Sequence, residues 1–128
     1  MKKFLLILTL MFTCSFVNAQ QVLWFKTTEM AIKYQGYEWS DWVPARMNVK
    51  FDLANDIIII YSDKTQIYKV LSINNPPYDA TGRQVAYSVI DQDYDRGQIR
   101  LRIENNGNSQ IYVDFNDVSW VYNVYRIQ

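Results

Sequence analysis

Histidine is absent from this 128-residue sequence, and cysteine occurs once, as Cys14. Without histidine the chain cannot build a Ser-His-Asp or Cys-His catalytic group, nor a zinc or haem site that depends on histidine ligands. The side chains left for catalysis are carboxylates, lysine, tyrosine and arginine. We therefore predict that the protein is not an enzyme and carries no cofactor, with calcium as the one exception considered below.

The first nineteen residues have the features of an export signal. Lys2 and Lys3 give a basic start, an apolar run follows from Phe4 to Phe12, and Val17-Asn18-Ala19 is a small-residue cleavage site. The apolar run is too short for a membrane-spanning helix, which needs roughly 20 residues. We expect a signal peptide over 1–19, a periplasmic or secreted protein and no transmembrane segment after the signal; an uncleaved anchor is the alternative.

Cleavage after Ala19 would also remove Cys14, and with it any disulfide, thiolate metal site or cysteine nucleophile. Lipid attachment at Cys14 is an alternative, although Thr13 stands where lipoprotein signals usually have a smaller residue. Loss of residues 1–19 takes away two lysines and leaves 11 basic against 13 acidic residues. This balance argues against nucleic acid or an anionic membrane surface as a partner. The expected partner is a small molecule or a component of the cell envelope.

Apolar and polar side chains alternate with a period of two through most of the remaining chain, which indicates β-strands. Four consecutive isoleucines at 57–60 suit a strand that is apolar on both faces, as in a central or closed-sheet position. Short connections predict that neighbours in sequence pair in space. The expected strands are 22–34, 37–43, 47–53, 57–61, 66–71, 85–90, 98–104, 111–115 and 118–127.

We therefore predict a single all-β domain over 20–128, an antiparallel up-and-down meander of eight or nine strands that closes into a small barrel; a β-sandwich is the alternative. Pro44 should interrupt its strand or place it at an edge. The two prolines in 74–82 cannot donate to a sheet, so this stretch should be a loop, and long loops often bind.

An exported chain of this length, with eight short meandering strands and an aromatic first strand, resembles the lipocalin-like (calycin-type) small barrels. Lipocalins carry Gly-x-Trp near the first strand, and the corresponding Gly36-Tyr37-Glu38-Trp39 has one residue more. The resemblance implies a barrel whose open mouth holds a small apolar ligand.

Aromatic residues are dense for a chain of this size, and rings that line a cavity or stack on a sugar can bind through apolar area and a polar tip. The alternative role for each ring is packing in the core or across strands. Trp42 and Tyr112 lie opposite their more apolar neighbours, so they are the strongest surface or ligand candidates. The predicted ligand-binding residues are Trp24, Trp39, Trp42, Tyr87, Tyr112 and Trp120.

Asp91, Asp93 and Asp95 place carboxylates at alternate positions, where they could converge on calcium. The stretch departs from an EF-hand loop, because the positions that need Gly and Glu hold Arg96 and Arg102. The alternative is a hairpin turn with solvated carboxylates. Both a calcium site and a plain turn remain open at this point.

Arg100 and Arg102 share a polar face, and Gln110 and Tyr112 should lie across the Asn-Gly hairpin from them. Such a row of donors could receive an anionic group, or it could be an ordinary outer face paired with acidic neighbours such as Asp114. On an outer surface, Arg100→Ala should change stability by less than about 0.5 kcal/mol.

Three functions remain. The first is an exported non-enzymatic β-barrel that binds a small or lipidic ligand in an aromatic-lined cavity. The second is a cell-envelope module with a filled core that contacts protein or glycan through Trp42 and the 74–82 loop. The third is a carboxylate-based enzyme. Cavity volume separates the first two, because a barrel packed with rings has no room for a ligand.

Overall fold

The computed structural model describes residues 22–74, 82–106 and 108–127. The predicted signal peptide at 1–19 and most of the predicted loop at 74–82 lie outside these ranges. Within them, no helix is both long and apolar enough to cross a membrane.

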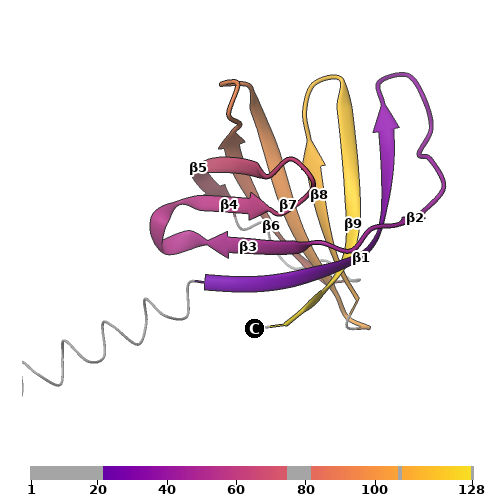
Figure 1. Cartoon of the computed structure of the whole chain (residues 1–128), viewed down its shortest axis with the longest axis horizontal. Helices are drawn as coiled ribbons and strands as arrows, with labels where there is room; N and C mark the ends of the chain where they lie inside the picture. The colour runs from indigo at the N-terminus through magenta and orange to yellow at the C-terminus, as the bar shows by residue number, and fades with distance from the viewer. Residues whose placement is uncertain (1–21, 75–81, 107, 128) are drawn as a thin grey trace, which may run out of the picture.

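The described residues form one nine-stranded antiparallel sheet in the order β2-β1-β3-β4-β5-β6-β7-β8-β9, with β9 also paired to β1 (Figure 1). Eight strands thus close into a barrel and β2 is an additional edge strand on β1, so the predicted closed meander is confirmed. A 3₁₀ turn, η1 (Leu53–Asn55), connects β3 to β4. The strands are β1 (Val22–Tyr34), β2 (Val43–Pro44), β3 (Asn48–Asp52), β4 (Ile57–Ile60), β5 (Gln66–Asn74), β6 (Gly82–Ile90), β7 (Arg96–Glu104), β8 (Ser109–Asp114) and β9 (Val118–Arg126).

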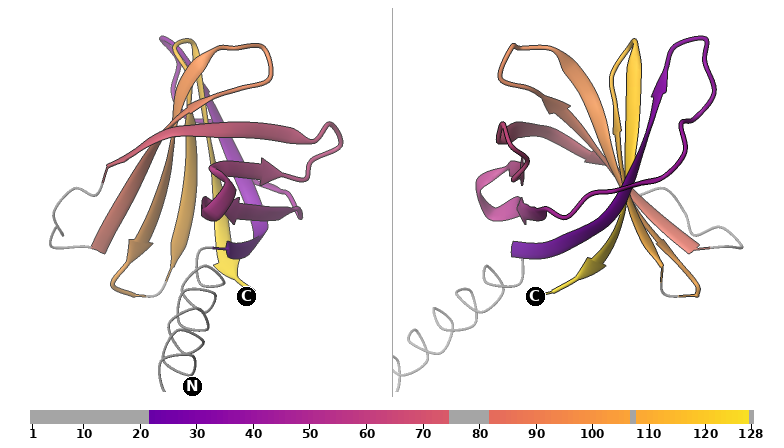
Figure 2. Two further views of the ribbon diagram at one scale, coloured as in Figure 1. Left: turned by 90° about the vertical axis from the view of Figure 1, so that its left-hand side faces the viewer. Right: turned by 45° about the vertical axis from the view of Figure 1, so that its right-hand side comes forward.

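Closure depends on the long first strand, which curves from the side of β3 to the side of β9 (Figure 2). Its pairing with β9 shifts register between Thr27 and Glu29, so the side chains exchange faces at this bulge. Thr27 is 1% exposed; its hydroxyl donates to the carbonyl of Ala45 at 2.5 Å and accepts from the N–H of Met47 at 2.9 Å. The bulge therefore fastens the chain that leads into β3.

The barrel interior is filled by apolar side chains. Phe51 contacts Phe25 and Tyr87 edge to face, with ring centroids 5.5 and 5.4 Å apart. A void large enough for water would leave accessible surface on the residues that line it. Interior residues of five strands have no accessible surface, so no such void adjoins them. The residues that are 0% exposed are Val49, Phe51, Ile58, Ile60, Val89, Ile99, Ile111 and Val113.

The isoleucine strand occupies the central position that its sequence predicts. Ile58 and Ile60 point into the core, and Ile57 and Ile59 are half-buried on the outer face. At coarse level the closed eight-strand barrel agrees with the lipocalin-like resemblance, and the finer family assignment stays a prediction.

The prediction of a strand over 37–43 is wrong for all but its last residue, because the strand begins only at Val43. Residues 35–42, which we call the strap, follow a turn in which Gly36 has φ +84°. Ser40 fastens the strap to β1: its N–H donates to the carbonyl of Ile32 at 2.8 Å and its hydroxyl accepts from the N–H of Ile32 at 2.9 Å. Pro44 does lie on an edge strand, as predicted.

Candidate functional site

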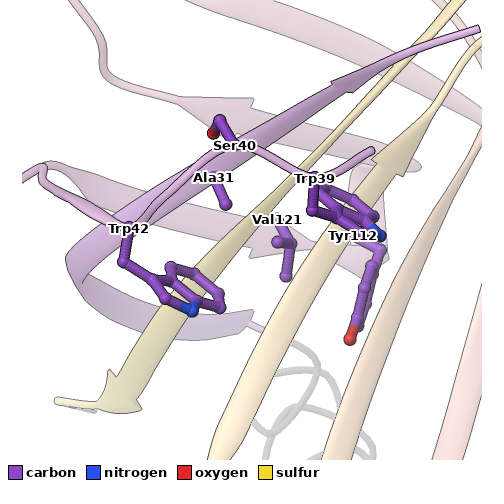
Figure 3. Close-up of a pocket in the computed structure, with 6 residues that line it drawn as sticks. All are labelled: Ala31, Trp39, Ser40, Trp42, Tyr112 and Val121. Carbon is purple, nitrogen blue, oxygen red and sulfur yellow. The ribbon is translucent and has the colours of Figure 1, made fainter. Parts of the chain in front are cut away.

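The strap and the outer wall of the barrel enclose a half-open hollow of about 290 Å³, which we call the outer-wall cleft (Figure 3). It lies on the face of the sheet opposite the core. The cleft is lined by Ala31, Trp39, Ser40, Trp42, Tyr112 and Val121.

Cross-strand pairing builds the floor of the cleft. Ala31 on β1 is opposite Val121 on β9, and Val121 is opposite Tyr112 on β8. Side chains that pair in this way lie on one face at contact distance. Ala31 and Val121 are each only 3% exposed despite facing outward. The small side chain of Ala31 leaves room above it, and the strap shields this room from solvent.

The walls of the cleft are two indoles that reach across β1 from the strap. Trp39 meets Tyr112 edge to face, with centroids 6.3 Å apart and an interplanar angle of 75°. Trp42 lies on the other side of Val121 (Figure 3). Both indoles are 42% exposed, so a second molecule can reach their faces.

A hydrogen-bonded row of polar side chains borders the floor. The Tyr112 hydroxyl donates to Gln110 Oε1 at 3.0 Å, Gln110 Nε2 donates to Asn123 Oδ1 at 3.0 Å, and Asn123 Nδ2 donates to Glu29 Oε1 at 3.0 Å. In the strand register, Gln110 on β8 and Glu29 on β1 both lie opposite Asn123 on β9, which is two residues from Val121. We call these four residues the polar row; because each is held by the next, their remaining donors and acceptors are fixed in direction.

Arg100 closes the far side of Tyr112. Its Nε donates to Asp114 Oδ2 at 2.7 Å and its Nη2 donates to Asp114 Oδ1 at 3.3 Å. The guanidinium carbon also lies 4.2 Å from the centroid of the Tyr112 ring. The predicted pairing of Arg100 with Tyr112 across β7 and β8 is present, and its charge is neutralised by Asp114.

Three of the six aromatic residues predicted to bind ligand, Trp39, Trp42 and Tyr112, therefore meet in one place. Trp24 lies elsewhere on the barrel, stacked on Tyr61 at 6.1 Å with Lys50 Nζ 5.4 Å from its ring.

The structure places the other two predicted residues with the core. Tyr87 is 3% exposed, and Trp120 packs on the core and stacks on Phe115 at 6.2 Å. Burial raises the pKa of Tyr87 and of Tyr122, and it raises the pKa of Tyr68 further, with the charges of Tyr122 and Asp91 adding to the rise. These phenols are neutral packing elements at ordinary pH.

The three aspartates proposed for calcium form the β6–β7 turn. Asp91 Oδ1 accepts from the N–H of Asp93 and from that of Asp95, each at 2.9 Å. Tyr94 adopts a left-handed φ of 65° within the turn. Across the described ranges, no group of three or more acidic, histidine or cysteine side chains is arranged to hold a metal ion. The Asp91 carboxylate thus serves as an acceptor that orders the turn.

A second hollow, of about 540 Å³, opens beside the β4–β5 turn. Met30 and Met47 form part of its lining, and both pack against the core. The remaining lining residues are Ala45, Arg46, Tyr61, Ser62, Asp63, Lys64 and Gln66.

Sequence reasoning missed Ala31, Ser40, Val121, Asn123 and Glu29. Ala31 and Val121 look like core residues in the sequence, and the bulge after Thr27 that turns Ala31 outward carries no clear pattern. Asn123 had a detectable signal, since it is a polar residue between the apolar neighbours Tyr122 and Val124.

Comparisons of this chain with protein-family models, curated proteins and solved structures found no match. The functional argument therefore depends on the geometry of the barrel and its outer-wall cleft.

Proposed function

We propose that this protein is an exported, non-enzymatic binding module that takes its ligand on the outside of the barrel, in the outer-wall cleft. The observation that carries this proposal is the contrast between the two faces. Interior side chains at the middle of the barrel have no accessible surface, whereas the cleft offers an apolar floor and two half-exposed indoles. Exposed aromatic side chains with a few ordered polar groups beside them are characteristic of ligand sites.

A binding role fits the carboxylates near the cleft better than catalysis does. Asp114 is paired with Arg100, and Glu29 accepts a hydrogen bond from Asn123. Neither faces a histidine or cysteine that it could activate, because the mature chain would hold neither residue type. These carboxylates orient neighbouring side chains, which supports a module that holds a ligand without transforming it.

The test is a fragment titration followed through the four tryptophan indole N–H signals in ¹⁵N-labelled protein. The probes are pyranosides, tetramethylammonium, short carboxylic acids and indole compounds. We expect at least one class to shift the Trp39 and Trp42 signals while Trp120, which packs on the core, stays unmoved. Assignment uses Trp39→Phe, Trp42→Phe and Trp24→Phe variants.

Two outcomes would overturn the proposal. Shifts confined to Trp120 would place the ligand in the interior, as in the cavity hypothesis. The cleft would be rejected as a binding site if two results coincide. None of the four probe classes shifts the Trp39 or Trp42 signal, and native mass spectrometry of protein from its own host finds no retained molecule.

A further inference from the structure

The outer-wall cleft presents an apolar strip between ordered polar groups, and this pattern matches the surface of a sugar. We propose that its ligand is a neutral glycan, with one pyranose ring held between Trp39 and Trp42 and its hydroxyl groups read by the polar row. This inference rests on the proposed function and names the chemical class of the ligand.

The walls and floor fit the apolar faces of a pyranose. A sugar ring carries C–H groups on its faces and hydroxyl groups around its edge, so it needs apolar contact above or below and polar contact at the side. Trp39 and Trp42 stand on either side of Val121, and Ala31 leaves space at the floor (Figure 3). Indole faces provide rigid apolar area that loses little conformational freedom on binding.

The polar row fits the hydroxyl edge. Asn123 lies two residues from Val121 along β9, which places it on the same face about 7 Å away. Gln110 has the same relation to Tyr112 on β8. In the chain of hydrogen bonds, each amide uses one N–H and its oxygen, so Asn123 Nδ2 and Gln110 Nε2 each keep one N–H for a ligand. Glu29 keeps a carboxylate oxygen as an acceptor for a hydroxyl.

The charges around the cleft select a neutral sugar over an acidic one. The strap contributes Glu38 and Asp41 and has no basic residue. Arg100, opposite Tyr112 in the strand register, is paired with Asp114 at 2.7 Å, and Lys33, two residues from Ala31 along β1, is outnumbered by the carboxylates of Glu29, Glu38 and Asp41. An acidic sugar would therefore meet uncompensated negative charge, which weakens its binding.

The same arrangement disfavours a quaternary ammonium ligand. An aromatic cage binds a cation through the faces of several rings. The Arg100 guanidinium already lies 4.2 Å from the Tyr112 centroid, so the face of that ring is occupied by a cation. Trp39 and Trp42 alone form a slot with two walls, which suits a ring that has two apolar faces.

The experiment titrates full-length mature protein with methyl β-glucopyranoside, cellobiose, N,N′-diacetylchitobiose and maltose, again with indole signals as the readout. Glucuronic acid is the matched acidic probe. We expect a neutral probe to shift the Trp39 and Trp42 signals, and disaccharides to bind more tightly than the monosaccharide. Glucuronic acid should bind at least threefold more weakly than its neutral counterpart.

Variants test the assigned roles. Trp39→Ala and Trp42→Ala should each weaken binding of the best probe tenfold or more, and Asn123→Ala and Gln110→Ala should each weaken it roughly threefold to tenfold. Trp24→Ala is the matched indole control and should leave binding unchanged, because Trp24 lies with Tyr61 outside the cleft. Thermal unfolding of every variant shows whether the barrel is intact, and Trp42→Phe replaces Trp42→Ala if the strap detaches.

The outcomes separate the two proposals. If another probe class shifts Trp39 and Trp42 while no saccharide does, the glycan inference is overturned and the outer-wall module stands. If saccharides bind but Asn123→Ala and Gln110→Ala have no effect, the role of the polar row is overturned. If no probe of any class reaches the cleft, and protein from its own host retains no molecule in native mass spectrometry, both proposals fail.

Discussion

At the scale of single residues, Arg100 illustrates how a side chain on an outer face becomes part of an ordered structure. Its side chain is 29% exposed, against 27% for Asp114, so the pair is partly withdrawn from water. The guanidinium also covers the Tyr112 ring that forms one end of the cleft. Arg100 is a support for the cleft, although its sequence pattern is that of an ordinary surface cation.

We expect Arg100→Ala to lower the free energy of unfolding by about 1 kcal/mol, because it removes a two-bond ion pair and a cation–ring contact. This is larger than the limit of about 0.5 kcal/mol expected for a plain surface residue. Urea unfolding of Arg100→Ala, Asp114→Ala and the double variant measures the coupling. Additive effects of the two single changes would contradict the pairing.

The buried tyrosines predict how stability depends on alkaline pH. The pKa values of Tyr68, Tyr87 and Tyr122 are raised above 10.0, chiefly by burial. Below the unfolded pKa, near 10, these phenols are neutral in both states and their contribution is fully present. Above it the unfolded chain loses protons that the fold retains, so stability falls as pH rises, by at most about 1.4 kcal/mol per pH unit for each tyrosine.

Urea unfolding between pH 8 and pH 11, with phenolate absorbance as a second signal, measures this slope. Tyr68→Phe should make the fall in stability with pH less steep, because one of the three phenols that keep their protons in the folded state is removed. A stability that stays constant up to pH 11 would show that these phenols ionise equally in the folded and unfolded states.

At the scale of elements, the bulge in β1 determines both closure of the barrel and the position of the strap. Before the bulge, Phe25 and Thr27 face the core; after it, Ala31 faces outward and Met30 packs on the core. Without the shift, the floor of the cleft would turn inward, since a one-residue change of register exchanges the two faces of a strand.

Thr27→Val tests this element. Valine keeps the shape of threonine but leaves the Met47 N–H and the Ala45 carbonyl without the hydroxyl that each now contacts. We expect the free energy of unfolding to fall by about 2 kcal/mol, the usual effect of unpaired buried polar groups. Thr28→Val is the control: Thr28 is exposed and its hydroxyl donates to the Asn123 carbonyl at 3.3 Å, so the loss should be below about 0.5 kcal/mol. Equal losses in the two variants would contradict the role of Thr27.

At the scale of the whole molecule, the first and last strands meet. Strands β1 and β9 pair along their length, from Phe25 opposite Arg126 to Tyr34 opposite Val118. Beyond this pairing, the N–H of Ile127 donates to the Trp24 carbonyl at 3.0 Å. The two ends of the described barrel are therefore adjacent, and the sheet is continuous around the core.

A circular permutant tests this closure. A short Gly-Ser linker joins Ile127 to Val22, and new ends are opened between Asp63 and Lys64 in the exposed β4–β5 turn. We expect a cooperatively folded barrel whose stability lies within about 2 kcal/mol of the parent, because only loop-closure entropy changes. Deletion of 118–127, which removes β9, should by contrast abolish cooperative unfolding. A permutant that fails to fold would show that the ends are not interchangeable.

The sequence predicted the barrel because its signals are repeated: alternating strands, short turns and an isoleucine strand that needs two covered faces all indicate one closed sheet. It predicted the cleft only in part. Tyr112 was identifiable from the face of β8 on which it lies, whereas Trp42 was assigned to the face of a strand that does not form. The meeting of both rings with Ala31 and Val121 depends on the bulge and on the path of the strap. The expected strand at 37–43 failed because Ser40 bonds to Ile32 and holds most of this stretch outside the sheet.

The pairing of β1 with β9 also orders events during biosynthesis. The ribosome releases β9 after β1–β8, so the barrel cannot close until the last described strand has emerged. Until then β1 has an unsatisfied edge, and the nascent polypeptide remains incompletely folded. For the exported protein proposed above, such a delay would keep the chain unfolded enough to pass through a secretion pore, and the barrel would close after transport.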